Sequence, residues 1–253
     1  MIHINDNTRK GRQVTMNDKE KDRFLFDLLD KSYERGVDEN ELNILEKLSY
    51  DEEDFFRGIV AKILVNSETE KSEEILIRLA KDKNSLVRTE ACDSLCISKS
   101  VTTYEMLKHI ALKDRIGMVR AYAIMSLGDI AYEVDKEDEL IEFLEEILVN
   151  ETVVLTKINI YTVLYSLGVE KYFPDLLKLI NSKKYTNRCA VARSLAEIVD
   201  EDNKDVIVEA LLERKKIETA YSVISTIDTV LKEIEEMEFE DEEEDEDDTY
   251  ASD

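Results

Sequence analysis

The chain has 253 residues, 43% of them hydrophobic, which is enough to bury a sizeable core. It contains only six glycines and one proline, too few turn-forming residues for a sandwich or barrel with many hairpins, so we expect an all-α protein. The formal net charge of −25 argues against nucleic acid or an anionic membrane as the main partner.

The N-terminal part of the chain predicts a short arm followed by two helices. Residues 1–16 lack the apolar segment of a signal peptide, so we expect a flexible arm and a cytoplasmic protein. Residues 17–49 contain two helical patterns, near 17–34 and 38–48. We expect these helices to cap the exposed end of the structure that follows.

A repeat runs through residues 50–232. Four segments, beginning at 57, 88, 120 and 188, share an arginine, a small apolar residue three positions later and a leucine seven positions later. Two weaker copies begin at 160 and 220. Because positions three and seven share one face of a helix, each copy presents a packing stripe. Second helices fill the intervals, so each unit is a helical hairpin that must stack on its neighbours.

An acid precedes the arginine by six residues in three of these copies. The pairs are Asp51 and Arg57, Asp82 and Arg88, and Asp114 and Arg120. Arg188 follows Ser182 in place of an acid, and in this alignment the copies at 160 and 220 lack both charges. We expect a looser stack in that part of the chain.

The pattern, best seen in DRIGMVRAYAIMSLG at 114–128, resembles HEAT repeats of the short bacterial kind related to phycobilisome lyases. The resemblance covers residues 50–232. It implies an all-α fold, a right-handed α-solenoid of about five to six HEAT-like helical hairpins. It also implies that the repeated acids and arginines, Arg188 included, form a structural ladder between neighbouring repeats.

The end of the chain differs in composition from the repeat. Residues 233–253 contain 14 acids and no base, which predicts a disordered acidic tail. Residues 1–232 still carry a net charge of −11 without it, so the folded body is itself acidic.

The sequence contains little that points to catalysis. Its two histidines are His3, in the arm, and His109, on a second helix. Cys92 and Cys96 lie four residues apart on one helix, but no further ligand completes a metal site. We therefore expect small buried cysteines, no cofactor, no metal and no enzyme activity.

The candidate binding surface is the acidic second helix at 137–150. Its apolar stripe leaves four acids on the outer side: Glu139, Glu142, Glu145 and Glu146. Tyr104 and Phe143 are candidate anchors near them. We expect second helices to line the concave face, where these acids would attract a basic protein. The alternative interpretation is an ordinary solvated face.

The main hypothesis is a non-enzymatic interaction module, a monomer that binds a basic protein partner through its acidic concave face. One form of it is an immunity protein that inhibits a cationic toxin. The alternatives are a general scaffold or adaptor, and a lyase-type chaperone or enzyme-assisting factor. The last of these would hold a prosthetic group near Cys92, Cys96 and His109.

Overall fold

The computed structural model describes residues 16–237, and this part of the chain consists of thirteen α-helices and four short 3₁₀ turns, with no strand. The expected all-α fold is therefore confirmed. The predicted N-terminal arm, apart from Met16, lies outside the described residues, as does the acidic tail after Met237.

The helices form two compact units, one ending at Leu176 and the other beginning at Leu177. The first unit contains α1 (Asp18–Arg35), α2 (Glu39–Leu48), α3 (Asp54–Leu64), α4 (Glu70–Leu79), α5 (Ser85–Ser94), α6 (Val101–Lys113), α7 (Gly117–Ala131), α8 (Glu137–Leu148) and α9 (Val154–Ser166). The second contains α11 (Tyr185–Glu197), α12 (Lys204–Ile217) and α13 (Tyr221–Glu236), and α10 (Phe173–Lys178) spans the boundary.

The first two helices begin at caps that their sequence provides. The side chains of Asn17 and Asp38 accept hydrogen bonds from the backbone N–H groups of Glu20 and Glu41. Each glutamate accepts a hydrogen bond from the backbone N–H of its cap residue in return, which completes a capping box. Gly36 follows α1 with φ of 72°, a conformation that glycine adopts without strain. These signals separate α1 and α2 into a hairpin.

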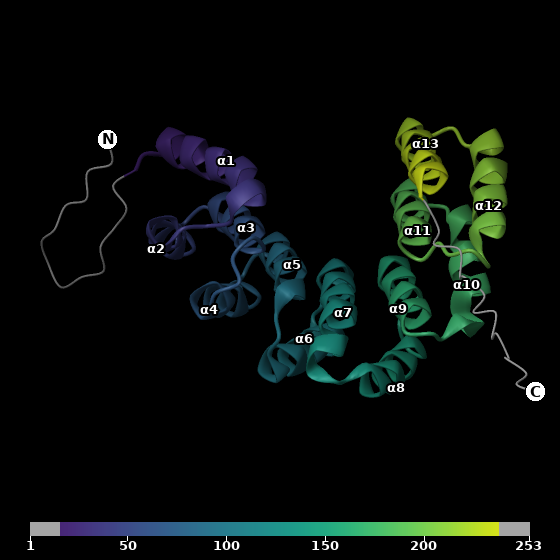
Figure 1. Ribbon diagram of the computed structural model, residues 1–253, viewed down its shortest axis with the longest axis horizontal. Helices are drawn as coiled ribbons and strands as arrows, with labels where there is room; N and C mark the ends of the chain where they lie inside the picture. The colour runs from purple at the N-terminus through teal and green to yellow at the C-terminus, as the bar shows by residue number, and fades with distance from the viewer. Residues whose placement is uncertain (1–15, 238–253) are drawn as a thin grey trace, which may run out of the picture. The chain divides into compact units, whose positions relative to one another are not determined.

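Within the first unit the odd-numbered helices α3, α5, α7 and α9 form one row, and the even-numbered helices form a second row beside it (Figure 1). The unit is curved, with the odd-numbered row on the inner side (Figure 1). The expectation that second helices line the concave face is therefore wrong for this unit, because α8 lies in the outer row.

Side chains of the odd-numbered helices form hydrogen bonds with the backbone of the neighbouring odd-numbered helix. Ser126 Oγ of α7 donates to the Cys92 carbonyl of α5 at 2.7 Å. Asn159 Nδ2 of α9 donates to the Ala121 carbonyl of α7 at 3.0 Å. Such bonds require small or short side chains at the contact, and small contact residues reduce the distance between helix axes.

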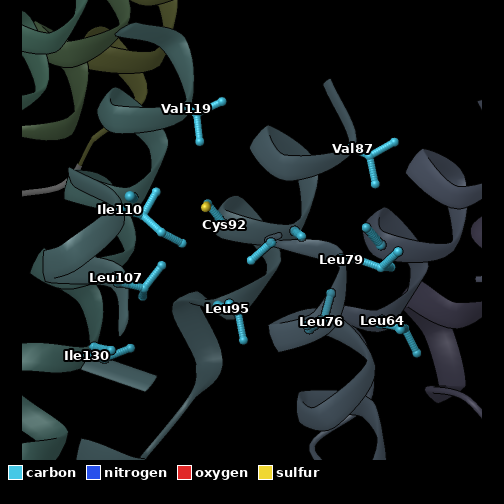
Figure 2. Close-up of a cluster of buried hydrophobic side chains, with 14 of the residues drawn as sticks. Leu64, Leu76, Leu79, Val87, Cys92, Leu95, Leu107, Ile110, Val119 and Ile130 are labelled. Atoms are coloured by element: carbon cyan, nitrogen blue, oxygen red, sulfur yellow. The ribbon is translucent and has the colours of Figure 1, made fainter. Parts of the chain in front are cut away.

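The apolar core follows the repeated stripe. The residues three and seven positions into the copies that are less than 5% exposed are Val60, Leu64, Ala91, Leu95, Ala123, Leu127, Val163, Val191, Leu195, Val223 and Ile227. Leu167 is only partly buried, because it follows the last turn of α9. Figure 2 shows the part of the core that α3 to α7 build. Each fully buried aliphatic side chain contributes about 1.5–3 kcal/mol, so this stripe stabilises the stack.

Semi-buried ion pairs connect successive hairpins of the first unit. They are Arg57 with Asp82 at 2.7 Å, Arg88 with Asp114 at 2.8 Å, and Arg120 with Glu151 at 2.8 Å. In each pair the arginine donates from both Nε and Nη2 to the two carboxylate oxygens. This bidentate geometry fixes direction as well as distance. Each arginine is thus paired with the acid of the next hairpin.

The third arginine shows how the ion pair fixes the position of two loops. Arg120 Nη1 donates to the Asp114 carbonyl at 2.9 Å, which anchors the loop that precedes α7. The acid on its other side, Glu151, also accepts the backbone N–H of Val153 at 2.7 Å, at the start of α9. One guanidinium therefore joins the start of its own hairpin to the start of the next.

The first helix follows the same frame with lysine in place of arginine. Lys21 N donates to the Asn17 carbonyl, as Arg120 N donates to the Ile116 carbonyl. Lys21 Nζ lies 2.7 Å from a carboxylate oxygen of Asp51. The helix predicted as a cap is thus in register with the repeat row, and it extends the ladder by one pair.

The weaker copy that the sequence alignment begins at residue 160 is misplaced by three residues. Lys157 N donates to the Val153 carbonyl, so Lys157 and not Ile160 occupies the arginine position of α9. The acid of this hairpin is Glu151, six residues before Lys157. The expectation that this copy lacks both charges is therefore also wrong. Glutamate fills the position that aspartate fills in the earlier hairpins.

The second unit contains an ion pair of the same geometry. Arg188 Nε lies 2.6 Å from Glu218, whose side chain is fully buried, and Arg214 lies 2.9 Å from the same carboxylate. The pairing with Arg188 holds the pKa of Glu218 well below its usual range. Glu218 is the acid of the last copy, so the absence of charge predicted there is wrong. Arg188 Nη1 donates to the backbone carbonyl of Ser182, as Arg120 Nη1 donates to that of Asp114. This bond therefore forms without an acidic side chain at residue 182.

The boundary predicted for the acidic tail at residue 233 is wrong. Helix α13 continues to Glu236 because Ile234, 1% exposed, packs in the core and holds the last turn in place. Lys232 and Glu236 form an ion pair one turn apart on its surface. The repeat array thus extends four residues further than predicted.

We predict that Arg120→Ala lowers the free energy of unfolding by about 3 kcal/mol, because it leaves Glu151 semi-buried without its partner. Urea denaturation followed by circular dichroism measures this. Arg115→Ala is the matched control, since Arg115 is exposed and its removal should change stability by less than about 0.5 kcal/mol. Equal effects of the two substitutions would contradict the structural role of Arg120.

We predict that Glu218→Gln flattens the acid limb of the stability profile. Because the pKa of Glu218 is lower in the folded chain than in the unfolded chain, the unfolded chain takes up the proton first. Its contribution is therefore complete above the unfolded pKa of about 4.3 and is lost as pH falls further. The variant should be less stable at neutral pH and lose less stability on acidification, while Glu209→Gln, at an exposed position of α12, keeps the wild-type profile.

Candidate partner-binding surface

The acids predicted on α8 are only partly free. Glu142 and Glu146 are exposed. Glu139 forms ion pairs with Lys108 of α6 and with Lys136, the second at 2.6 Å. These two lysines lower the pKa of Glu139, Lys108 having the larger effect. The surface is therefore less negative than the sequence alone indicates.

The other predicted residues of this surface are also engaged. Glu145 lies 2.5 Å from Lys171 and accepts a hydrogen bond from the Tyr172 hydroxyl. Phe143 is partly buried, with Lys108 Nζ 5.4 Å from its ring centroid. Tyr104 is fully buried, so the expectation that it anchors a partner is wrong. It lies on the core stripe of α6, three residues before the buried Leu107, and packs there.

A second group of acids lies on the odd-numbered helices. We define the inner acidic surface as Glu90 and Asp93 of α5 and Asp129 of α7; Glu90 is half-buried and the other two are exposed. Among residues 16–237 none of the three forms an ion pair. Glu90 and Asp93 lie three residues apart on one face of α5, and all three residues belong to helices of the odd-numbered row.

The charge of the inner acidic surface is poorly compensated. Loss of surrounding water, with a smaller contribution from Asp93, raises the pKa of Asp129 to about 6. Desolvation raises the pKa of Glu90 and of Asp93 as well, and Lys62 of α3 opposes the shift in both. Raised carboxyl pKa values mean that the folded protein holds these negative charges at a cost, and a cationic group placed beside them would lower that cost.

The inner acidic surface was not predicted from the sequence, because the first helix of each hairpin carries the repeated structural pattern of acid and arginine. The available signal was the presence of charged residues on the exposed side of those helices. Leu86, Glu90 and Asp93 are spaced four and three residues apart, which places them on one face of α5. That face is distinct from the buried stripe of Ala91 and Leu95.

The residues suspected of holding a prosthetic group lie in different surroundings. Cys92 is buried, Cys96 is half-buried and His109 is exposed on α6. Burial raises the pKa of Cys92 to about 12 and that of Cys96 to about 11, so both are protonated thiols at neutral pH. Within the described part of the chain, no group of three or more His, Cys, Asp or Glu side chains is placed to hold a metal ion. No helix among residues 16–237 is both long and apolar enough to span a membrane.

Comparison with known proteins identifies the repeat. The sequence model described as HEAT repeats matches residues 42–128. No curated protein sequence matches the chain. Among solved structures, a chain of the complex of CpcE and CpcF of phycocyanin lyase from Nostoc sp. PCC7120 superposes with a TM-score of 0.53 and 13% identity, covering 91% of this chain and 99% of that one.

A second structure, human deoxyhypusine hydroxylase in complex with glycerol, gives a TM-score of 0.41 and 14% identity over 87% of this chain and 92% of that one. At 13% identity, the likeness to the phycocyanin lyase chain shows a common fold and nothing about activity. The helical hairpins and the arginine ladder of the structure agree with the match to the HEAT repeat model. The described part of the chain is all-α, and residues 42–128 match the HEAT repeat model.

Proposed function

We propose that this protein is a non-enzymatic interaction module, acting as a monomer, that binds a basic protein partner through the inner acidic surface. The observation that carries the proposal is that Asp93 of α5 and Asp129 of α7 are exposed and form no ion pair with any of residues 16–237. A lysine or arginine side chain from a partner would relieve the repulsion between these carboxylates.

The arginine ladder supports a positive charge on the partner. Arg57, Arg88, Arg120 and Arg188 are largely buried and are already paired with acids. The ladder acids therefore neutralise the positive charge of these arginines within the fold. The chain as a whole has a net charge of −25, so carboxylates outnumber cations among its remaining charged groups. Long-range attraction of this kind speeds the encounter with a basic protein and weakens as salt is added.

The exposed acids of α8, Glu142 and Glu146, form the second candidate surface for the same partner. We favour the inner acidic surface because lysines already neutralise Glu139 and Glu145 on either side of them. An inhibitor of a cationic toxin, such as an immunity protein, is one form that this function would take. A general scaffold with several basic partners is the other.

A second candidate function is a lyase-type chaperone or enzyme-assisting factor. Its support is the shared fold with a chain of the phycocyanin lyase complex. The protonated, buried state of Cys92 counts against thiol chemistry in this role. Absorbance spectra and metal analysis of protein purified from its own host would test it, and a colourless, metal-free preparation would contradict it.

We predict that Asp93→Lys combined with Asp129→Lys weakens binding of the basic partner at least about tenfold at low salt. The partner is first captured from host extract at about 0.05 M salt, identified, produced separately and titrated by calorimetry. The matched control, Glu142→Lys combined with Glu146→Lys, changes the net charge by the same amount on the outer row and should alter affinity much less. Melting temperatures of both variants establish that they are folded.

Three outcomes would contradict this proposal. One is an acidic partner. Another is binding of equal strength at about 0.05 M and about 0.5 M salt, which excludes an electrostatic mechanism. The third is a larger loss of affinity in the α8 variant than in the inner-surface variant, which would move the binding site to the outer row.

A further inference from the structure

An apolar groove lies between α3 and α5 in the first unit. Its volume is about 300 Å³, and the side chains that line it include Phe55, Ile59, Leu86 and Val87. Phe55 is 52% exposed and Leu86 is 60% exposed. Large apolar side chains that stay this exposed next to one another mark interaction sites more often than single exposed residues do.

The groove is open because α3 carries a glycine at its base. Gly58 stands in the middle of the helix, and a Cβ added there would meet no atom within 4 Å. Neither backbone conformation nor a close contact requires glycine at this position. Glycine costs about 1 kcal/mol relative to alanine in a helix interior. The sequence thus accepts a less stable helix at a lining position where a side chain would enter the open space of the groove.

A further aromatic ring extends the apolar surface toward α1. The ring centroids of Phe26 and Phe55 lie 6.2 Å apart, and Phe26 is 49% exposed. The lining of the groove also includes Glu90, which belongs to the inner acidic surface. Asp54 is the second acid among the lining residues, and Lys62 is the one cation among them. The groove is therefore lined by apolar side chains together with two acids and one lysine.

We propose that this groove receives one large apolar side chain of the basic partner, flanked in the partner's sequence by lysine or arginine that reaches Glu90 and Asp93. The inference rests on the proposed function and specifies the partner's recognition segment. The charge of the border selects a basic segment over an acidic one. A volume at the lower end of the range for small-molecule pockets suits a single side chain.

The proposal is tested with two synthetic pentapeptides added to the full chain. The first is Lys-Lys-Phe-Lys-Lys, and the second has serine in place of phenylalanine. Binding is followed by the methyl NMR signals of Ile59, Leu86 and Val87, which line the groove. We expect saturable shifts of these signals with the phenylalanine peptide, and an affinity at least about tenfold higher than that of the serine peptide.

A variant that closes the groove separates docking from folding. Gly58→Leu places a side chain in the open space and replaces glycine by a good helix former, so its melting temperature should equal or exceed that of the wild type. Its affinity for the phenylalanine peptide should fall to that of the serine peptide. The matched control His109→Leu adds the same side chain at an exposed position of the outer row and should leave the affinity unchanged.

The outcomes distinguish this proposal from the function on which it rests. If both peptides bind equally and perturb only residues around Asp93 and Asp129, the groove proposal fails and the inner acidic surface stands. If neither peptide gives a saturable shift, the groove proposal also fails. If Gly58→Leu folds and binds the phenylalanine peptide as well as the wild type does, the site lies elsewhere.

Discussion

The bidentate bond between an arginine of one hairpin and a carboxylate of the next is the interaction on which the rest of this structure depends. Arg120 shows why a permanent cation belongs at the start of an apolar helix: it donates to the Asp114 carbonyl on one side and to Glu151 on the other. Hydrophobic contacts are non-directional, so they drive the hairpins together without fixing their register. The guanidinium fork supplies the missing direction, and repeating it along the first unit sets each hairpin at the same position relative to the last.

The surface chemistry follows from this use of arginine. A residue type that would otherwise counter the acids of the surface is placed inside, where its charge is cancelled by a ladder acid. The remaining carboxylates are then unequally compensated: lysines neutralise Glu139 and Glu145 on the even-numbered row, whereas Asp93 and Asp129 on the odd-numbered row form no ion pair within residues 16–237. The groove beside Gly58 is lined by Glu90 of the inner acidic surface, so charge and apolar surface occur together between α3 and α5.

The repeat and the core could be predicted from the sequence because both depend on local spacing. The three Asp and Arg pairs follow one interval, and within each helix the apolar residues four positions apart, at 60 and 64, 91 and 95, and 123 and 127, follow helical periodicity. Glu151 and Glu218 escaped prediction because a longer side chain performs the role of aspartate, and Lys21 because lysine replaces arginine. The candidate site could not be predicted in the same way. Exposure of Asp93, burial of Tyr104 and the pairing of Glu139 with Lys108 depend on which helix faces which, and curvature depends on the spacing of helix axes.

A double-mutant cycle on Arg120 and Glu151 tests the central claim most directly, because it isolates the interaction between the two side chains from the effect of removing either one. The free energy of unfolding is measured for the wild type, Arg120→Ala, Glu151→Ala and the double variant. A ladder pair that joins two hairpins predicts a coupling energy of about 1–3 kcal/mol, with the double variant less destabilised than the sum of the single variants. Additivity within about 0.5 kcal/mol would show that the two side chains act independently, and would contradict the ladder as the interaction that fixes the stack.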